Sequence, residues 1–309
     1  MTRRTRRALI PTFLNTFPEV VHAMKSSDWP STVRRYGPSS ILAIILVFIL
    51  SIRLAPKDAV LVEDFTSFSG NDPWYHARIV HVIVTNFPAT LDFDPWSQFP
   101  FGTGRHSGFG SLFDQLIALA ALIVGGGNPD PQLVNSVIAY APAIFGTVTA
   151  IPVYFVARAL MNRWAALLST GMLALLGGQF LSRTIIGAAD HQSAEAFFAT
   201  LAIFGFIYSV SYAYREKPLI ADFEDRNTVV LRAPVAASIL GGMAIASYLM
   251  TWPPGVMLVF AMGSFVLIQA IRDHLENRSL DYLAFATSFS MIPAAILLLF
   301  DVKSFELNA

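Results

Sequence analysis

The chain has 309 residues, of which 54% are hydrophobic and 14% are charged, and its positive and negative charges cancel. Its mean hydropathy is +0.55, whereas about a quarter of the residues in an ordinary soluble domain are charged. This composition excludes a soluble fold, and the balanced charge indicates no nucleic-acid partner. The absence of cysteine excludes disulfides, thiolate metal sites and cysteine nucleophiles.

The N-terminal segment is basic and begins MTRRTRRALIPTFL. An export signal would place a short apolar stretch and a small-residue cleavage site directly after the arginines, but polar sequence continues to about Ser40. We therefore predict a cytoplasmic tail over residues 1–38 and a transmembrane region over residues 39–309.

Long apolar runs follow the tail. A membrane-spanning helix needs roughly 20 apolar residues, and seven runs approach that length: 39–56, 132–157, 164–184, 193–213, 230–250, 254–271 and 281–300. The sequence therefore predicts an all-α integral membrane protein, a helical bundle of about seven spans.

One further apolar stretch, residues 110–126, is ambiguous. It is short, carries Asp114 and Gln115 in its first turn and ends in three glycines. If it spanned the membrane, the basic loops after the second, fourth and sixth spans would all lie outside, against the positive-inside bias. We predict that it lies in the membrane interface, which places the N-terminus in the cytoplasm and the C-terminus outside.

This topology makes residues 57–131 one external loop, far longer than ordinary connections. Residues 73–86 within it have Pro73 at the first position and Asn71 or Asp72 near the cap, which predicts an interfacial helix. Long loops often carry function, and the polar residues of this one include Asp64, Asp72, Asp92, Asp94, Asp114, His76, His81 and His106.

Two external motifs carry candidate chemistry: GNDPWYH at 70–76 and GAADHQSAE at 187–195. Asp72 lies at a helix start and Asp190 just beyond a span, so both are held near the external membrane face. Two carboxylates that meet there can bind Mg²⁺ or Mn²⁺, which prefer oxygen ligands, and histidine is an acceptable ligand of Mn²⁺. Such an ion would neutralise a phosphate or pyrophosphate leaving group.

Each of these acidic residues also has a purely structural interpretation. Asp72 would serve as a helix N-cap, and Asp190 with Glu195 would form the solvated start of the span 193–213. The histidines of the external loop would be hydrogen-bonded interface residues rather than ligands. The residues alone leave these alternatives open.

Four motifs occur in order along the chain: GNDPWYHAR at 70–78, DPWSQFPFG at 94–102, PxxxG at 142–146 and SRTIIGAADHQ at 182–192. With this order and spacing the chain resembles the catalytic subunit of oligosaccharyltransferase, particularly the archaeal type. The resemblance implies a GT-C type glycosyltransferase of the cell membrane with its active site on the external face. Such an enzyme moves an oligosaccharide from dolichyl phosphate or pyrophosphate to the Asn of an N-x-S/T sequon in an acceptor polypeptide.

The resemblance also implies the site. Asp72 and Asp190 would be the catalytic residues and would bind Mn²⁺ or Mg²⁺, with Gln192 at the third position of the family's D-x-D or D-x-H motif. A neutral amide binds a divalent cation more weakly than a carboxylate, so His191 or Glu195 would complete the ligand set.

The lipid-linked substrate would lie beside these residues, with its chain against the spans near 193–250 and among membrane lipids. The residues expected to contact the lipid phosphate are His76, Arg78, Trp74 and Glu195.

Family members continue with further spans, an external loop with a catalytic Glu and a soluble C-terminal domain with a WWDYG motif. The chain reaches Ala309 without these features. We therefore expect the N-terminal membrane part of the enzyme, without the C-terminal soluble domain and inactive on its own.

Two other functions compete with this interpretation. A GT-C monosaccharide transferase that uses a polyprenyl-phosphate sugar also pairs an acidic first external loop with many spans. A transporter would use Asp72 and Asp190 as ion-pathway residues, but no predicted span has a carboxylate near its centre, where an ion relay needs one.

Overall fold

The computed structural model describes residues 31–63, 65–91, 93–104, 112–216, 228–304 and 306–307. The chain divides after Ile41 into two compact units. In the first unit, the described residues form the beginning of helix α2 (Ser31–Leu54). Most of the predicted tail lies outside the described residues, as do Asp64, Asp92 and His106.

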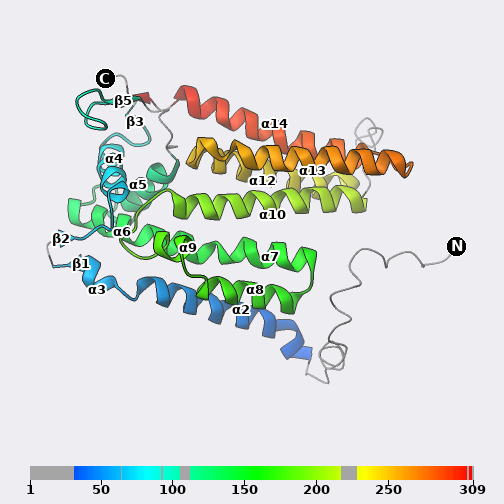
Figure 1. Cartoon of the computed structure of the whole chain (residues 1–309), viewed down its shortest axis with the longest axis horizontal. Coiled ribbons are helices and arrows are strands. Elements are labelled where there is room, and N and C mark those ends of the chain that lie inside the picture. Colours follow the sequence, from blue (N-terminus) through cyan, green and yellow to red (C-terminus); the bar gives the residue numbers. More distant parts are fainter. Residues whose placement is uncertain are drawn as a thin grey trace. The chain divides into compact units, whose positions relative to one another are not determined.

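The second unit, residues 42–309, is a bundle of apolar helices that run alongside one another (Figure 1). Six stretches of the described chain are long and apolar enough to cross a membrane: Tyr36–Val60, Pro131–Leu160, Gln192–Arg215, Leu231–Thr251, Pro253–Leu275 and Asp281–Leu299. They coincide with six of the seven predicted spans. The bundle helices that form them after α2 are α6 (Pro131–Val148), α7 (Ala150–Leu160), α10 (Gln192–Glu216), α12 (Thr228–Thr251), α13 (Val256–Leu275) and α14 (Asp281–Ser304).

The predicted span 164–184 is not one continuous helix, which corrects the prediction. It consists of α8 (Arg163–Leu175) and the short α9 (Gln179–Arg183). Asn162 caps α8 by accepting hydrogen bonds from the amides of Trp164 and Ala165, each at 3.0 Å. The helix ends at Leu175, where the backbone of Leu176 becomes extended. Gly178, the N-cap of α9, has φ +72°, which glycine adopts without steric cost.

Small residues allow the central helices to approach closely. A Cβ added to Gly205 of α10 would lie 2.6 Å from the Cα of Gly241 on α12. One turn further along α10, the buried Ser209 hydroxyl lies 2.6 Å from that of Ser238 and 3.4 Å from that of Ser290 on α14. Small residues and paired hydroxyls are the usual means by which helices associate in membranes, where apolar burial drives little.

The long loop after α2 folds against one end of the bundle (Figure 1). Its main helix, α4 (Asp72–Asn86), begins at the predicted position with a proline in its first turn. Helix α5 (Leu112–Val124) has 13 residues, about 20 Å of helix, which is shorter than a hydrocarbon core of about 30 Å. The smaller elements of this region are α3 (Lys57–Val60), β1 (Leu61–Val62), β2 (Phe65–Thr66), β3 (Thr90–Leu91), β4 (Phe93–Asp94) and β5 (Thr103–Gly104).

Short two-stranded ladders stabilise this end. β1 pairs with β2 and β4 with β5 in antiparallel register, while β3 pairs in parallel with β6 (Glu306–Leu307), which follows α14. The 3-10 helix η2 (Pro253–Gly255) connects α12 to α13 at the same end.

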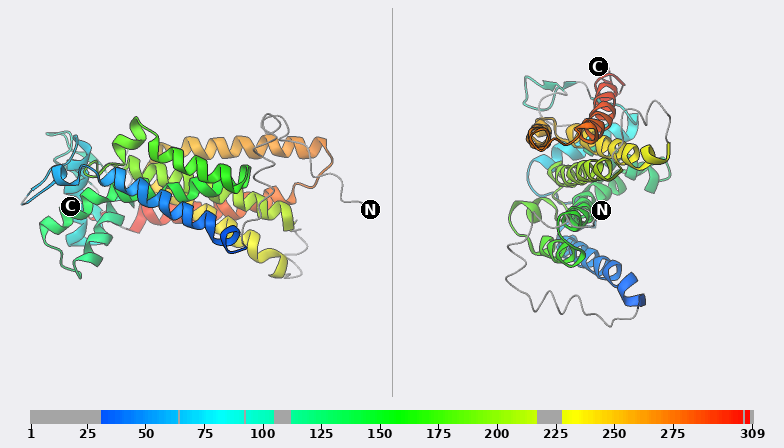
Figure 2. Two further views of the ribbon diagram at one scale, coloured as in Figure 1. Left: turned by 90° about the horizontal axis from the view of Figure 1, so that it is seen from below. Right: turned by 90° about the vertical axis from the view of Figure 1, so that its right-hand side faces the viewer.

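The largest apolar cluster lies beneath the loop and joins α4 and α5 to α6 and α10. Its fully buried members include Val80, Ile83, Phe113, Ile138 and Ala194. The turn between α7 and α8 and the turn between α13 and α14 lie at the opposite end of the bundle (Figures 1 and 2). The helix ends at these turns and the turn after α13 carry Arg158, Arg163, Arg272 and Arg278. The bundle therefore has a basic end and an end that holds α4, α5 and the loop before α10.

Candidate functional site

The loop before α10, residues 184–191, is fastened by backbone hydrogen bonds to three other segments. The amide of Ile186 donates to the carbonyl of Arg53 at 3.0 Å, and that of Gly187 donates to the carbonyl of Ala139 at 2.9 Å. The carbonyl of Gly187 accepts from the amide of Ser69 at 3.0 Å. These bonds hold the loop rigidly against α2, α6 and the start of the external segment.

A buried arginine of α2 also contacts this loop. Arg53 is fully buried, its Nε donates to the hydroxyl of Thr184 at 3.1 Å, and its guanidinium lies 5.2 Å from the centre of the Phe180 ring. A Cβ on Gly146 of α6 would lie 2.6 Å from Arg53 Nε. Gly146, the last residue of the PxxxG motif, therefore leaves the space that Arg53 occupies.

Asp190 is fully buried at the end of this loop. Its Oδ2 accepts from Arg183 Nη1 at 2.7 Å, its Oδ1 lies 2.7 Å from His191 Nδ1, and Oδ1 also accepts from the Gln192 amide at 3.3 Å. Burial opposes ionisation, but the hydrogen bond and charge of His191, the Gln192 amide and the charge of His76 together lower the pKa of Asp190. Asp190 is therefore a buried carboxylate and not a solvated helix start.

His76 of α4 is fully buried beside this carboxylate. Its Nδ1 lies 2.8 Å from Oδ1 of Asp114 on α5, and its ring centre lies 5.6 Å from that of His191. Burial alone would lower the pKa of His76, but the charge and hydrogen bond of Asp114, with the charges of Asp190 and Asp72, raise it.

His76, Asp190 and His191 together form a cluster with metal-ligand composition. One ligand atom from each lies within 4.8 Å of the other two, and all three residues are buried. Imidazole nitrogen and carboxylate oxygen are the donors that divalent transition metals take in proteins. The donor set therefore fits a divalent cation.

Asp72 lies outside this three-residue cluster. Asp72 is the first helical residue of α4 and therefore not its N-cap, and the side chain of Asn71 at the N-cap position makes no capping hydrogen bond. The Asp72 carboxylate is 47% exposed, and its Oδ2 lies 3.9 Å from the Arg183 Nη1 that binds Asp190. Arg183 therefore brings the two carboxylates to one guanidinium.

The structure places the other predicted residues at different distances from this centre. Glu195 lies in the first turn of α10, and its amide donates to the His191 carbonyl at 2.8 Å. Trp74 is half-exposed and packs against Phe68, with ring centres 5.0 Å apart.

Arg78 forms an ion pair with Asp94. Its Nη1 donates to Asp94 Oδ1 at 2.9 Å, and its Nη2 contacts Asp94 Oδ2 and Ser97. Arg78 thereby ties α4 to the DPWSQFPFG motif. The sequence prediction assigned Arg78 to the lipid phosphate, and its partner in the structure is Asp94.

Two residues of the site were missed from the sequence. Asp114 was noticed only as a charge that weakens a span, and Arg183 only as part of a motif. No spacing rule joins Asp114 to His76 or Arg183 to Asp72, since each pair comes from different elements. Arg183 and Asp190 are seven residues apart with a non-helical loop between them, so their contact also depends on the loop conformation.

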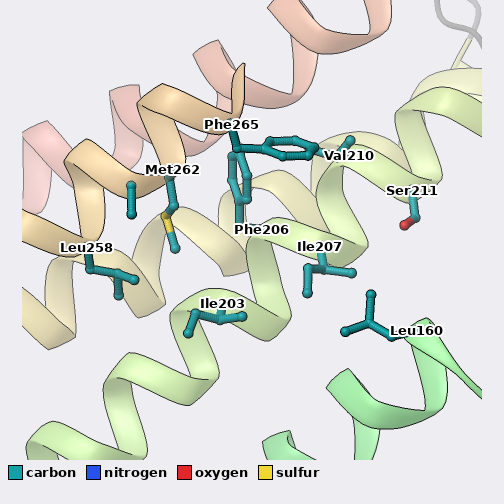
Figure 3. Close-up of a pocket in the computed structure, with 10 residues that line it drawn as sticks. Leu160, Ile203, Phe206, Ile207, Val210, Ser211, Leu258, Met262 and Phe265 are labelled. Carbon is teal, nitrogen blue, oxygen red and sulfur yellow. The ribbon is translucent and has the colours of Figure 1, made fainter. Parts of the chain in front are cut away.

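An apolar cavity of about 430 Å³ lies between α10, α13 and the end of α7 (Figure 3). Its lining includes Leu160, Ile203, Phe206, Leu258, Met262 and Phe265. Ile203 follows Gln192 by 11 residues on α10, about 16 Å along the helix axis. The cavity is therefore separate from the polar cluster.

The bundle of apolar helices, with a buried cluster of carboxylate and histidine side chains at one end, places the chain in the class of multi-span membrane proteins with a polar, metal-competent site. Within that class, the chain belongs to the family described as oligosaccharyl transferase STT3, N-terminal, whose model matches residues 42–306.

A curated relative is the dolichyl-monophosphooligosaccharide–protein glycotransferase AglB of Haloferax volcanii. The two are 40% identical over 264 residues, which cover 85% of this chain and 25% of the relative. The chain thus spans about a quarter of the length of this relative.

Solved structures of oligosaccharyltransferase from Archaeoglobus fulgidus share the fold. One is in complex with an inhibitory peptide and a dolichol-phosphate, with TM-score 0.76, 26% identity and coverage of 87% of this chain and 30% of that one. Another, tethered to an acceptor peptide with the NVT sequon, has TM-score 0.76, 27% identity and coverage of 87% and 30%. A third, in complex with Zn and sulfate, has TM-score 0.72, 26% identity and coverage of 84% and 31%.

Proposed function

We propose that this chain is the N-terminal membrane part of an archaeal oligosaccharyltransferase. The complete enzyme transfers an oligosaccharide from dolichyl phosphate or pyrophosphate to the Asn of N-x-S/T sequons. The observation that carries this proposal is the buried cluster of His76, Asp190 and His191 beside Asp72, at the end of a bundle of this family. The family match favours this function over a monosaccharide transferase or a transporter.

In this proposal the end of the bundle that holds α4, α5 and the loop before α10 lies on the external face of the cell membrane, and the N-terminus lies in the cytoplasm. Support comes from the basic turns, which gather at the opposite end (Figure 1). Lys and Arg are enriched on the cytoplasmic side of membrane proteins.

The proposed metal ligands are Asp190, Asp72, His191 and Gln192, and the structure adds His76 as a neighbour of the same centre. The bound ion, Mn²⁺ or Mg²⁺, would neutralise charge on the lipid phosphate. The histidine-containing donor set favours Mn²⁺ over Mg²⁺, because Mg²⁺ is bound almost entirely by oxygen.

The protein's own side chains would divide the remaining work. Half-exposed Asp72 would accept hydrogen bonds from the acceptor amide, whose nitrogen is a poor nucleophile while its lone pair is delocalised. Arg183, held between Asp72 and Asp190, would add positive charge beside the departing phosphate. Preorganised charges of this kind commonly supply much of an enzyme's rate.

The isoprenoid chain of the carrier would lie along α10 and α12, the spans predicted to contact it. The cavity in Figure 3 is lined by apolar side chains apart from Ser211 and opens on α10, which suits a hydrocarbon chain. Ile203→Trp would fill this cavity, and we expect it to raise the KM for the lipid carrier without changing Mn²⁺ affinity. An unchanged KM would place the chain elsewhere.

The decisive experiment measures Mn²⁺-dependent transfer of a lipid-linked glycan to an N-x-T peptide by the complete protein in membranes. Asp190→Asn and Asp72→Asn should each lose nearly all activity, while Asp58→Asn, on an exposed carboxylate of α3, should retain it. Retention of most activity by both site variants would show that these carboxylates are structural.

A further inference from the structure

Asp114 is a buried carboxylate in an otherwise apolar helix. It lies in the first turn of α5 and is 3% exposed. Removing a carboxylate from water costs several kcal/mol unless a partner compensates it. The partner is His76, whose Nδ1 lies 2.8 Å from Asp114 Oδ1.

This contact determines which nitrogen of His76 carries the proton. An ionised carboxylate only accepts hydrogen bonds, so Nδ1 of His76 must be the donor. In the neutral ring the lone pair then resides on Nε2, and this is the nitrogen whose chemistry suits a cation ligand.

The neighbouring residue on α5 fixes the plane of the same ring. Phe113 is fully buried and packs edge-on against His76, with ring centres 5.1 Å apart and an interplanar angle of 84°. Two consecutive residues of α5 therefore hold His76: Asp114 contacts its Nδ1, and Phe113 packs against its ring.

Asp114 is not a member of the metal-competent cluster but contacts one of its members. The cluster consists of His76, Asp190 and His191, and Asp114 reaches it through His76. Carboxylates that accept from the second nitrogen of a ligating histidine orient the ring and increase its basicity, and their loss typically weakens metal binding by about 10- to 100-fold.

We propose that Asp114 is a positioning residue that orients the His76 ring for cation binding by the cluster of His76, Asp190 and His191. The proposal rests on the proposed function above, because it assumes that His76 lies at a cation site. It assigns a role to the interfacial helix α5, which provides the residue that orients a side chain on α4.

The test is Mn²⁺ affinity of the complete protein in detergent, measured from the electron paramagnetic resonance signal of free Mn²⁺. Asp114→Ala should raise the Kd for Mn²⁺ by about 10- to 100-fold. Asp114→Asn should raise it less, because the amide oxygen can still accept from Nδ1.

A double-variant cycle separates positioning from a general loss of structure. His76→Ala should weaken Mn²⁺ binding as much as Asp114→Ala, and adding Asp114→Ala to it should cause no further loss. The matched control is Asp273→Asn, which changes a fully buried carboxylate of α13 that accepts from Tyr282 at 2.6 Å. It should leave the Mn²⁺ Kd unchanged.

The possible failures are distinguishable. Wild-type Kd values in both Asp114 variants, beside a weakened His76→Ala, would overturn the positioning role and leave the metal site intact. Wild-type Kd values in His76→Ala and Asp190→Asn would overturn the proposed ligands themselves. If Asp114→Ala does not fold, Asp114→Asn decides, since it preserves the shape of the side chain.

Discussion

Arg183 binds the buried Asp190 carboxylate with an N–O distance of 2.7 Å, and the same Nη1 lies 3.9 Å from Asp72. The guanidinium thus lies between the two carboxylates that the sequence motifs single out. A positive group at this place offsets the charge of both, which a divalent cation would also do.

Replacement of Arg183 should show whether a divalent cation can take over the charge that the guanidinium supplies to Asp72 and Asp190. We expect Arg183→Gln to lower the Tm of the metal-free protein, because a buried carboxylate that loses its partner costs about 1–3 kcal/mol. Added Mn²⁺ should then raise the Tm more in the variant than in the wild type, since the ion replaces the lost charge. Thermal unfolding in EDTA and in Mn²⁺ measures both effects.

The control for this variant is Arg272→Gln, which removes a surface pair with Glu276 at 3.1 Å. Exposed pairs contribute little to stability, so its Tm should stay near that of the wild type. Equal Mn²⁺ effects in Arg183→Gln and the wild type would contradict the role assigned to Arg183.

The Asp94–Arg78 pair predicts a specific dependence of stability on pH. Burial opposes ionisation of Asp94, but hydrogen bonds from Arg78, Ser97 and the Trp96 amide lower its pKa from 3.8 to about 2. A depressed pKa stabilises the folded state above the ordinary value, and this contribution disappears as pH falls through the folded value. The window of loss therefore runs from 3.8 down to about 2.

We accordingly expect Asp94→Asn to have a lower Tm than the wild type near neutral pH. The difference should shrink as the pH falls through that window. Arg78→Gln should reproduce both effects, because it removes the other half of the pair. A Tm difference that is constant down to acid pH would show that Asp94 does not stabilise through its charge.

Gly146 provides a test of the support beneath the Asp190 loop. Gly146→Ala would place a methyl group against Arg53 and Thr184, and overpacking of this kind costs about 1–3 kcal/mol. We expect a lower Tm and weaker Mn²⁺ binding, because Thr184 begins the loop that carries Asp190.

Gly263→Ala is the matched control, since a Cβ at this α13 position meets no atom within 4 Å. Replacing glycine by alanine within a helix stabilises it by up to about 1 kcal/mol. Its Tm should be unchanged or higher, and equal losses in the two variants would contradict the packing argument.

The sequence was sufficient to predict the class of protein and most of its spans. Apolar length is a local property, so six of the seven predicted spans coincide with stretches of the described chain that are long and apolar enough to cross a membrane. The start of α4 was also predictable, because Pro73 favours a first helical turn. The span 164–184 was mispredicted because hydropathy does not register where a helix breaks: the backbone is extended at Leu176 and has φ +72° at Gly178, which separates α8 from α9.

The motif residues Asp72 and Asp190 were recognised from the sequence, but their environments were not. Nothing local predicts that Asp190 is fully buried and Asp72 half-exposed. That His76 lies with Asp190 and His191, and that Asp114 binds it from α5, depends on contacts between residues far apart in the chain. Sequence determined which segments are helical and apolar, because those are properties of neighbouring residues. Only the tertiary structure decided which side chains meet, because packing of separate helices sets those distances.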